Sequence, residues 1–216
     1  MVIHNLYLYF CTAILCVIFQ IIYFLINRKN DSGKVSIKKI ILVYIFLIPY
    51  LSLVYDVTTI YGVFWRIWES GTANISMERV FLIPFTTVPI SNPLPYLLNI
   101  LMTIPLGFLL PVIWSDFRSL KKVMLAVFLL SLTIETAQLF TGWRLSATDD
   151  LIANTLGAMV GYFMFKVMLK VFKNLENNSI PSKIKNESTY YLILSFVGAF
   201  FLYYNDIIRH LRNLNR

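Results

Sequence analysis

IETAQLFTGWRLSATDDLIANTLGA, residues 134–158, joins two strongly apolar runs of the chain through a short polar segment. Its polar and charged side chains include Glu135, Gln138, Arg144, Asp149, Asp150 and Asn154. Charged side chains are scarce overall, because 58% of the 216 residues are hydrophobic and only 14% are charged. The mean hydropathy of +0.69 also lies well above that of ordinary soluble domains. The chain is therefore predicted to be a membrane protein in which this segment connects two membrane helices.

Further apolar runs approach the length of about 20 residues that a helix needs to cross a bilayer. Six helices are expected, at residues 6–26, 40–55, 93–114, 120–140, 151–172 and 190–204. The second run contains Pro49 and the sixth is short, so five crossings are the alternative. The expected fold is an all-α, polytopic bundle of membrane helices. We expect two N-terminal membrane helices in residues 1–60, an external interfacial or re-entrant segment in 61–92, a three-helix core in 93–172, a cytoplasmic loop in 173–189, and a C-terminal membrane helix with a tail in 190–216.

Lysine and arginine indicate how the helices are oriented, because the cytoplasmic loops of membrane proteins are enriched in both. Most of the 19 basic residues follow the first, third and fifth runs, within the segments 28–39, 118–122 and 166–185. If these segments are cytoplasmic, both termini lie outside, although Arg209, Arg212 and Arg216 of the tail run against this bias. Because loops account for most of the basic residues behind the net charge of +8, nucleic acid is not expected as a partner.

The polar residues of the opening segment fall on narrow faces of two predicted helices. At about 100° per residue, arcs of about 60° hold Ser131, Glu135, Gln138 and Gly142 on one helix, and Asp150, Asn154, Gly157 and Gly161 on the next. The pattern Gly157-x-x-x-Gly161 lets another helix approach closely, within the chain or in a dimer. Under the predicted topology, Asn99 and Thr103 of the third run enter at the same depth. Three helices are therefore expected to bring polar groups together.

Glu135 is expected about 10 Å inside the end of its helix, because it lies seven residues before Gly142. An isolated carboxylate at this depth needs a proton or a partner, and Arg144 is the nearest candidate. An intramembrane carboxylate that faces a helix bundle suggests a functional site. The structural alternative is that Thr148 or Asp149 caps the fifth helix, that Asp150 favours its N-terminus, and that the remaining groups only hold the bundle together.

Cysteine and histidine offer little for catalysis or metal binding. Cys11 and Cys16 lie about 140° apart on one predicted helix, so they cannot form a disulfide with each other. His4 and His210 lie near opposite termini. A Ser-His-Asp triad and a histidine-rich metal site are therefore not expected. Without a Gly-rich phosphate loop, no cofactor is expected either.

The external segment mixes aromatic and charged residues, a composition typical of a membrane interface. We expect an interfacial helix at its start. The later FLIPFTTVPI, residues 81–90, is too short to span and is rich in proline, which favours a re-entrant lid over the polar groups. Arg66 and Arg79 are available to bind a phosphate or carboxylate, since guanidinium groups form bidentate hydrogen bonds with both. An ordinary interfacial loop is the alternative.

Four stretches occur in an order that resembles the VanZ-like family of bacterial membrane proteins. They are ERVFLIPFTTV at residues 78–88, NILMTIPLGFLLP at 99–111, SLTIETAQLF at 131–140 and GWRLSATDDLIANTLGAMVG at 142–161. The resemblance covers residues 78–161 and leaves out the first, second and sixth helices. Phe81 departs from it, because many members have asparagine there. The family's polar residues correspond to Arg79, Asn99, Glu135, Gln138, Arg144, Asp150 and Asn154.

The resemblance implies a cell-envelope protein of the bacterial plasma membrane, in a family with some members associated with resistance to lipoglycopeptides such as teicoplanin. Our hypothesis is an outward-facing polar pocket, covered by the Pro84 segment, that binds an anionic envelope amphiphile such as a lipid-linked cell-wall precursor or a lipoglycopeptide. Arg79 and Arg144 would hold the headgroup and Glu135 and Gln138 would accept its hydrogens. Asn99 and Asn154 would orient the carboxylate.

Two other classes remain open. One is a membrane enzyme that modifies lipids with Glu135 and Asp150 as an acid/base pair or as metal ligands. It is less favoured, because the histidines are so far apart in the sequence. The other is an accessory subunit or lipid transporter, which is also less favoured because the sequence shows no convincing internal repeat. The sequence does not indicate an oligomeric state.

Overall fold

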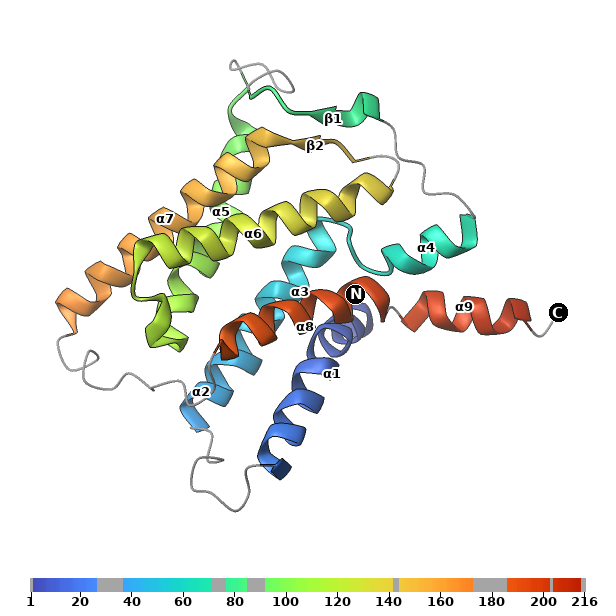
Figure 1. Ribbon diagram of the computed structural model, residues 1–216, viewed down its shortest axis with the longest axis horizontal. Coiled ribbons are helices and arrows are strands. Elements are labelled where there is room, and N and C mark those ends of the chain that lie inside the picture. The colour runs from blue at the N-terminus through green and yellow to red at the C-terminus, as the bar shows by residue number, and fades with distance from the viewer. Residues whose placement is uncertain are drawn as a thin grey trace. The chain divides into compact units, whose positions relative to one another are not determined.

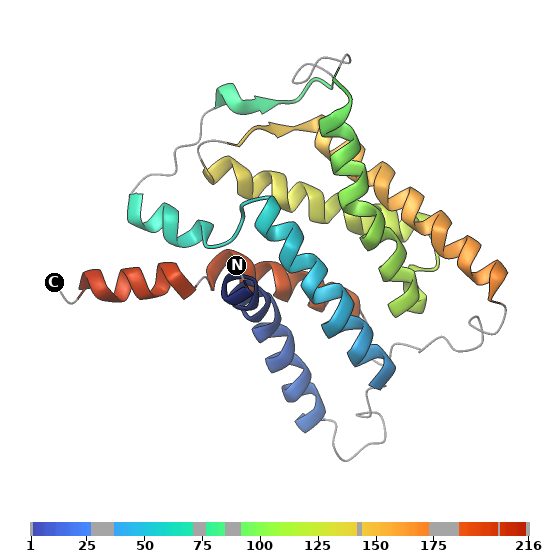
Figure 2. The same cartoon turned by 180° about the vertical axis from the view of Figure 1, so that it is seen from behind.

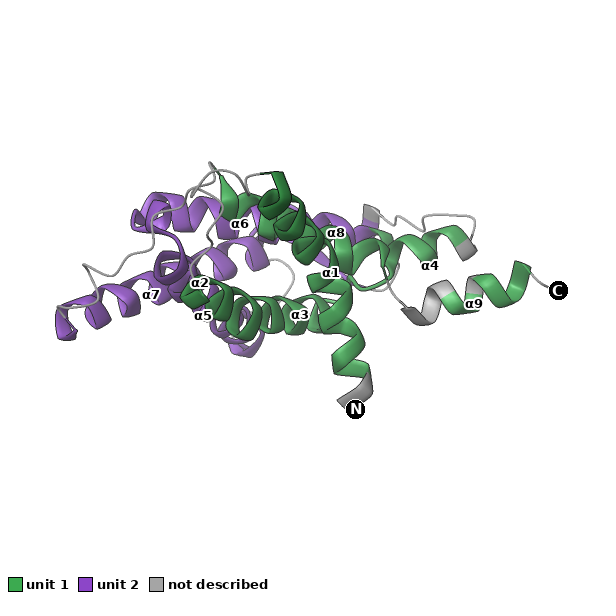
Figure 3. Cartoon of the chain, turned by 90° about the horizontal axis from the view of Figure 1, so that it is seen from below, with its two compact units in different colours: residues 1–75, 140–142, 183–216 green, residues 76–139, 143–182 purple. Residues whose placement is uncertain are grey.

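The computed structural model describes residues 2–26, 37–70, 77–84, 92–141, 144–172, 186–202 and 204–214. The chain divides into two compact units, which Figure 3 colours separately. Unit 1 comprises Met1–Ile75, Phe140–Gly142 and Lys183–Arg216, and unit 2 comprises Ser76–Leu139 and Trp143–Ser182. Five described helices are long and apolar enough to cross a membrane: His4–Ile26, Ile37–Val57, Leu94–Ile113, Leu120–Thr141 and Thr148–Val171. The expected all-α, polytopic fold is confirmed.

Unit 1 consists of helices. They are α1 (Val2–Ile26), α2 (Ile37–Ile41), the π-helical η2 (Leu42–Leu47), α3 (Ile48–Val57), α4 (Val63–Ser70), α8 (Glu187–Phe201) and α9 (Tyr204–Leu214) (Figure 1). The second predicted crossing is the continuous run from α2 to α3. Pro49 follows the π-helical η2 directly, and the backbone at the junction stays helical, so Pro49 does not end the crossing.

The sixth predicted crossing is the shorter helix α8. It has 15 residues, fewer than the roughly 20 that a straight crossing requires. Its first residue nevertheless contacts the start of the second crossing, and its last turn contacts the turn that follows this crossing. The Lys39 ammonium donates to the Glu187 carboxylate over 2.7 Å, and the Gly62 N–H donates to the Ala199 carbonyl over 3.0 Å. α8 also packs along α1, where Gly198 lies against the Cys11 carbonyl.

The two cysteines occupy the interior and the flank of α1. Cys16 is fully buried and Cys11 is half-buried, and neither forms a disulfide in the described part of the chain. Their place in the helix is that of packing residues, since Cys16 lies against the backbone of Tyr191 in α8.

Unit 2 contains three long helices and a short strand pair. Its elements are η3 (Met77–Arg79), β1 (Val80–Phe81), α5 (Leu94–Ile113), η4 (Ser115–Phe117), α6 (Leu120–Gln138), β2 (Ser146–Ala147) and α7 (Thr148–Val171), and the turn η5 (Leu139–Thr141) follows α6. Strands β1 and β2 pair in parallel, with Val80 opposite Ser146 and Phe81 opposite Ala147. Both views show α5 beside α7, and the strand pair beside the start of α7 (Figures 1 and 2).

Glycine allows α5 and α7 to pack with their backbones in contact. A Cβ atom on Gly107 would overlap the backbone of Ala158, and one on Gly157 would overlap the carbonyl of Ile100. Gly161 lies in the same way against the carbonyl of Ile104. The Gly157-x-x-x-Gly161 pattern therefore serves packing within the chain, by the small-residue mechanism common between membrane helices.

The external segment is described only in part. A helix, α4, is present at its start, as expected. The predicted re-entrant stretch is described as far as Pro84, where Leu82, Ile83 and Pro84 are exposed. Residues 85–90 of the predicted lid lie outside the described residues.

Candidate functional site

Glu135 lies in the last turns of α6 and is buried, with 6% of its surface exposed. Its carboxylate accepts a hydrogen bond from the backbone N–H of Ala147, over 3.2 Å. Ala147 is the last residue of β2, opposite Phe81 of β1. The short strand pair thus holds a backbone donor against an acidic group that would be costly to bury without a partner.

Asparagine side chains connect the three long helices of unit 2. The Asn99 amide of α5 donates to the Asp150 carboxylate of α7 over 2.5 Å. The Asn154 amide of α7 donates to the Ser131 hydroxyl of α6 over 2.8 Å, and the Thr103 hydroxyl of α5 donates to the Asn154 carbonyl over 2.7 Å. The expected convergence of polar groups is present, but these amides bind Asp150 and Ser131 instead of orienting Glu135.

The first residues of α7 make contacts with other segments of unit 2. The Thr148 hydroxyl donates to the carbonyl of Leu82, just beyond β1, over 3.0 Å. The buried Asp149 carboxylate accepts a hydrogen bond from the Tyr96 phenol of α5 over 3.2 Å. The N-cap position is occupied by Ala147, which makes no side-chain capping bond. The structural alternative, in which Thr148 or Asp149 is the N-cap of α7, is therefore wrong, and both side chains bond to neighbouring segments.

The charges at this end of unit 2 act on one another. The positive charge of Arg144 attracts both the Glu135 and the Asp150 carboxylates. The Asp150 carboxylate repels that of Glu135, and the Asp149 carboxylate repels that of Asp150. The expected relation between Arg144 and Glu135 is therefore electrostatic, while the hydrogen bonds to Glu135 come from the Ala147 backbone and the Ser146 side chain. Carboxylates outnumber guanidinium groups in this set.

Some buried polar atoms at this end have no hydrogen-bond partner among the described residues. They include the side-chain oxygen of Asn154, a residue with 4% of its surface exposed, and one terminal nitrogen of Arg79. Buried polar atoms are rarely left unpaired in proteins, so each calls for an explanation such as a ligand. Gln138, the remaining predicted site residue, is buried on α6.

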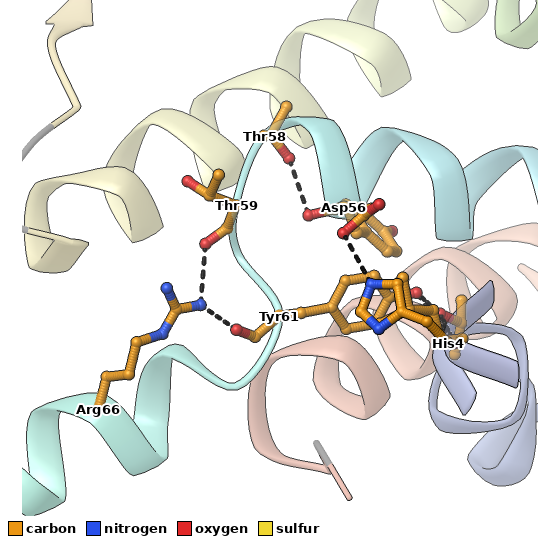
Figure 4. Close-up of polar contacts among 9 residues, drawn as sticks. His4, Asp56, Thr58, Thr59, Tyr61 and Arg66 are labelled. Atoms are coloured by element: carbon orange, nitrogen blue, oxygen red, sulfur yellow. Dashed lines mark hydrogen bonds and ion pairs between the residues drawn. The ribbon is translucent and has the colours of Figure 1, made fainter. Parts of the chain in front are cut away.

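Arg66, a further predicted anion ligand, belongs to unit 1 and has a different role. Its guanidinium group donates to the carbonyls of Thr59, over 3.2 Å, and of Tyr61 (Figure 4). These carbonyls belong to the turn between α3 and α4, in which Thr59 has a φ of 60°. The side chain thus stabilises a turn, next to which His4 and Asp56 lie 3.8 Å apart.

Sequence reasoning missed Tyr96 and the strand pair. Tyr96, Asn99 and Thr103 lie three and seven residues apart, which places them on one face of α5. That spacing would have identified Tyr96 as a member of the polar face of α5. Strands of two residues leave no periodic pattern, so the backbone donor to Glu135 had no signal. Among the described residues, no group of three or more His, Cys, Asp or Glu side chains is arranged to hold a metal ion.

Comparison with known proteins identifies a family. No curated protein and no solved structure matches the chain. A family model described as VanZ/LLP1 matches residues 7–170, about three quarters of the chain. The match is wider than the resemblance in residues 78–161, because it also includes α1 and the second crossing. The chain is therefore a multi-pass membrane protein that belongs to the VanZ/LLP1 family.

Proposed function

We propose that the polar end of unit 2 binds the headgroup of an envelope amphiphile, either a lipid-linked cell-wall precursor or a lipoglycopeptide such as teicoplanin. The observation that carries this proposal is the gathering of Glu135, Asp150 and Arg144 at the ends of helices long enough to cross a membrane. Ionisable residues in such helices are expensive and usually mark a pathway or a ligand site.

The unpaired atoms support a ligand over a purely structural network. A network that only holds helices together is most stable when all of its donors and acceptors are paired. Here the Asn154 oxygen and an Arg79 nitrogen have no hydrogen-bond partner among the described residues. A headgroup supplies both partners, because a phosphate accepts from a guanidinium group and a hydroxyl or amine donates to an amide oxygen.

The proposed site faces outward, where both candidate ligands occur. This orientation follows from the basic residues of unit 2, since Arg118, Lys121, Lys122 and Lys170 lie toward the opposite ends of α5, α6 and α7 from the site. Binding at the outer face is the proposed basis of an effect on teicoplanin resistance. The protein would hold the drug or its target lipid near the membrane surface.

Drug tolerance of cells tests this function. Glu135→Gln and Arg144→Ala should each reduce teicoplanin tolerance at equal protein level, because each removes one charge from the site. Asp116→Asn and Lys122→Ala are matched controls, since both residues are exposed at the other end of unit 2. Unchanged tolerance in both site variants would refute the proposal.

A lipid-modifying enzyme is the second candidate, because the carboxylates of Glu135 and Asp150 act on each other. Such a pair can divide the roles of general acid and general base. The two functions predict different membranes. An enzyme produces a lipid species that disappears in Glu135→Gln and Asp150→Asn, whereas a binding protein leaves the lipid composition unchanged.

A further inference from the structure

The acidic character of the site narrows the class of its ligand. Glu135, Asp149 and Asp150 contribute three carboxylates, and Arg144 is the basic side chain whose charge acts on Glu135 and Asp150. We infer that the ligand carries a cationic ammonium group that faces Glu135 and Asp150, in addition to an anionic group. The headgroup is therefore zwitterionic, as in an amine-bearing phospholipid or peptidolipid. This inference rests on the proposed function, which by itself requires no particular charge.

The hydrogen bonds of the two carboxylates support this assignment. Glu135 accepts from the Ala147 N–H and the Ser146 hydroxyl, and Asp150 accepts from the Asn99 amide. All three donors are neutral, so none of these bonds cancels a negative charge. Neither carboxylate forms an ion pair with another residue in the described part of the chain. A carboxylate has about four lone-pair sites, so both groups can accept further hydrogen bonds from an ammonium group.

The arginines provide the complementary half of the site. In the parallel register of β1 and β2, Val80 lies opposite Ser146. Arg79 directly precedes β1 and Arg144 lies two residues before β2, so both arginines lie at the same end of the strand pair. The carboxylates of Asp149 and Asp150 follow β2 at the start of α7. Guanidinium groups thus precede the strands and carboxylates follow them, which suits a headgroup with separated phosphate and ammonium groups.

A purely anionic headgroup fits this arrangement less well. An anion bound to Arg144 would also lie within the field of Glu135 and Asp150, and like charges repel strongly where water is scarce. An ammonium group on the same ligand removes this repulsion and pairs with the carboxylates. The difference in affinity between a zwitterionic and a purely anionic ligand should therefore depend on Glu135 and Asp150.

Lipid binding to the full-length protein tests the inference. The probes are phosphatidylethanolamine and phosphatidylglycerol with identical acyl chains, titrated into detergent-solubilised protein and counted by native mass spectrometry. Phosphatidylethanolamine should bind about tenfold more tightly, equivalent to about 1.4 kcal/mol. Glu135→Gln and Asp150→Asn should each remove most of this preference, and Asp116→Asn should retain it. The two amide variants have nearly the shape of the acids, and a circular dichroism melt checks that they remain folded.

The outcomes separate this inference from the proposed function. Equal binding of the two lipids, or tighter binding of phosphatidylglycerol, overturns the ammonium assignment. If Glu135→Gln still lowers teicoplanin tolerance in that case, the proposed function stands and only the ligand class is wrong. If tolerance is also unchanged in Glu135→Gln and Arg144→Ala, both fail. A preference that survives in Glu135→Gln and Asp150→Asn also overturns the inference, because the carboxylates would not be its cause.

Discussion

The contact between α5 and α7 can be tested by adding one methyl group. In Gly157→Ala, the new Cβ would overlap the Ile100 carbonyl and the Thr103 hydroxyl. The Ile100 carbonyl is part of a helix backbone, so it cannot rotate away as a flexible side chain would. The two helices must separate instead, which also strains the hydrogen bond from Thr103 to the Asn154 carbonyl.

The expected loss of stability is the balance of three effects. Overpacking of this kind costs about 1–3 kcal/mol, and a weakened interhelical hydrogen bond costs about 0.6 kcal/mol more. The higher helix propensity of alanine returns about 1 kcal/mol. We therefore expect Gly157→Ala to lower the free energy of unfolding by about 2 kcal/mol, which corresponds to a roughly thirtyfold change in the equilibrium.

Unfolding in mixed detergent micelles, followed by far-UV circular dichroism with increasing dodecyl sulfate, measures this change. Leu156→Ala is the matched control, because the neighbouring Leu156 side chain is 42% exposed on α7. Its truncation should change stability little, since lipid or detergent surrounds it in both states. A Gly157→Ala protein as stable as wild type would show that α5 and α7 do not pack as described.

Two further predictions concern unit 1. Lys39→Met should lower the free energy of unfolding by about 3–5 kcal/mol, because the Glu187 charge would remain buried without its partner. The double variant Lys39→Met with Glu187→Leu should recover most of this stability. If the effects of the two substitutions simply add in the same unfolding assay, the described ion pair is contradicted. If α8 completes a sixth crossing, residues 2 and 214 lie on the same side of the membrane. Single cysteines at these positions should then react with an impermeant maleimide from the same side of sealed vesicles. Labelling from opposite sides would limit the chain to five crossings.

Helix positions followed from the sequence because long apolar runs and periodic polar faces leave a strong signal. The face of Asp150, Asn154, Gly157 and Gly161 was correctly expected to meet other helices, because Asn154 bonds to α6 while Asp150 and both glycines contact α5. Helix ends were less well predicted. Asp149 and Thr148 looked like caps because such residues are common at helix starts, but tertiary partners bind both side chains.

Other features depended on contacts between distant residues. The Glu135 carboxylate meets a backbone N–H twelve residues away, which only the pairing of β1 with β2 positions. Nothing in a two-residue strand indicates its partner. The buried ion pair of Lys39 with Glu187 joins residues 148 positions apart, and both residues lie in segments that the sequence assigned to solvated loops. Local patterns therefore predicted the helices and their polar faces, while long-range pairing set the contacts between distant segments.

Photo-crosslinking tests the central claim, that the polar end of unit 2 binds a headgroup, most directly. Full-length protein in nanodiscs would be irradiated with a phospholipid that carries a diazirine on its headgroup, and the modified peptides would be identified by mass spectrometry. We predict crosslinks near Asn99, Glu135 and Asn154 that are lost in Glu135→Gln, while background crosslinks near Trp114 and Arg118, at the other end of unit 2, are unchanged. Crosslinks at the polar end that are equally strong in both proteins, or none there at all, would contradict the claim.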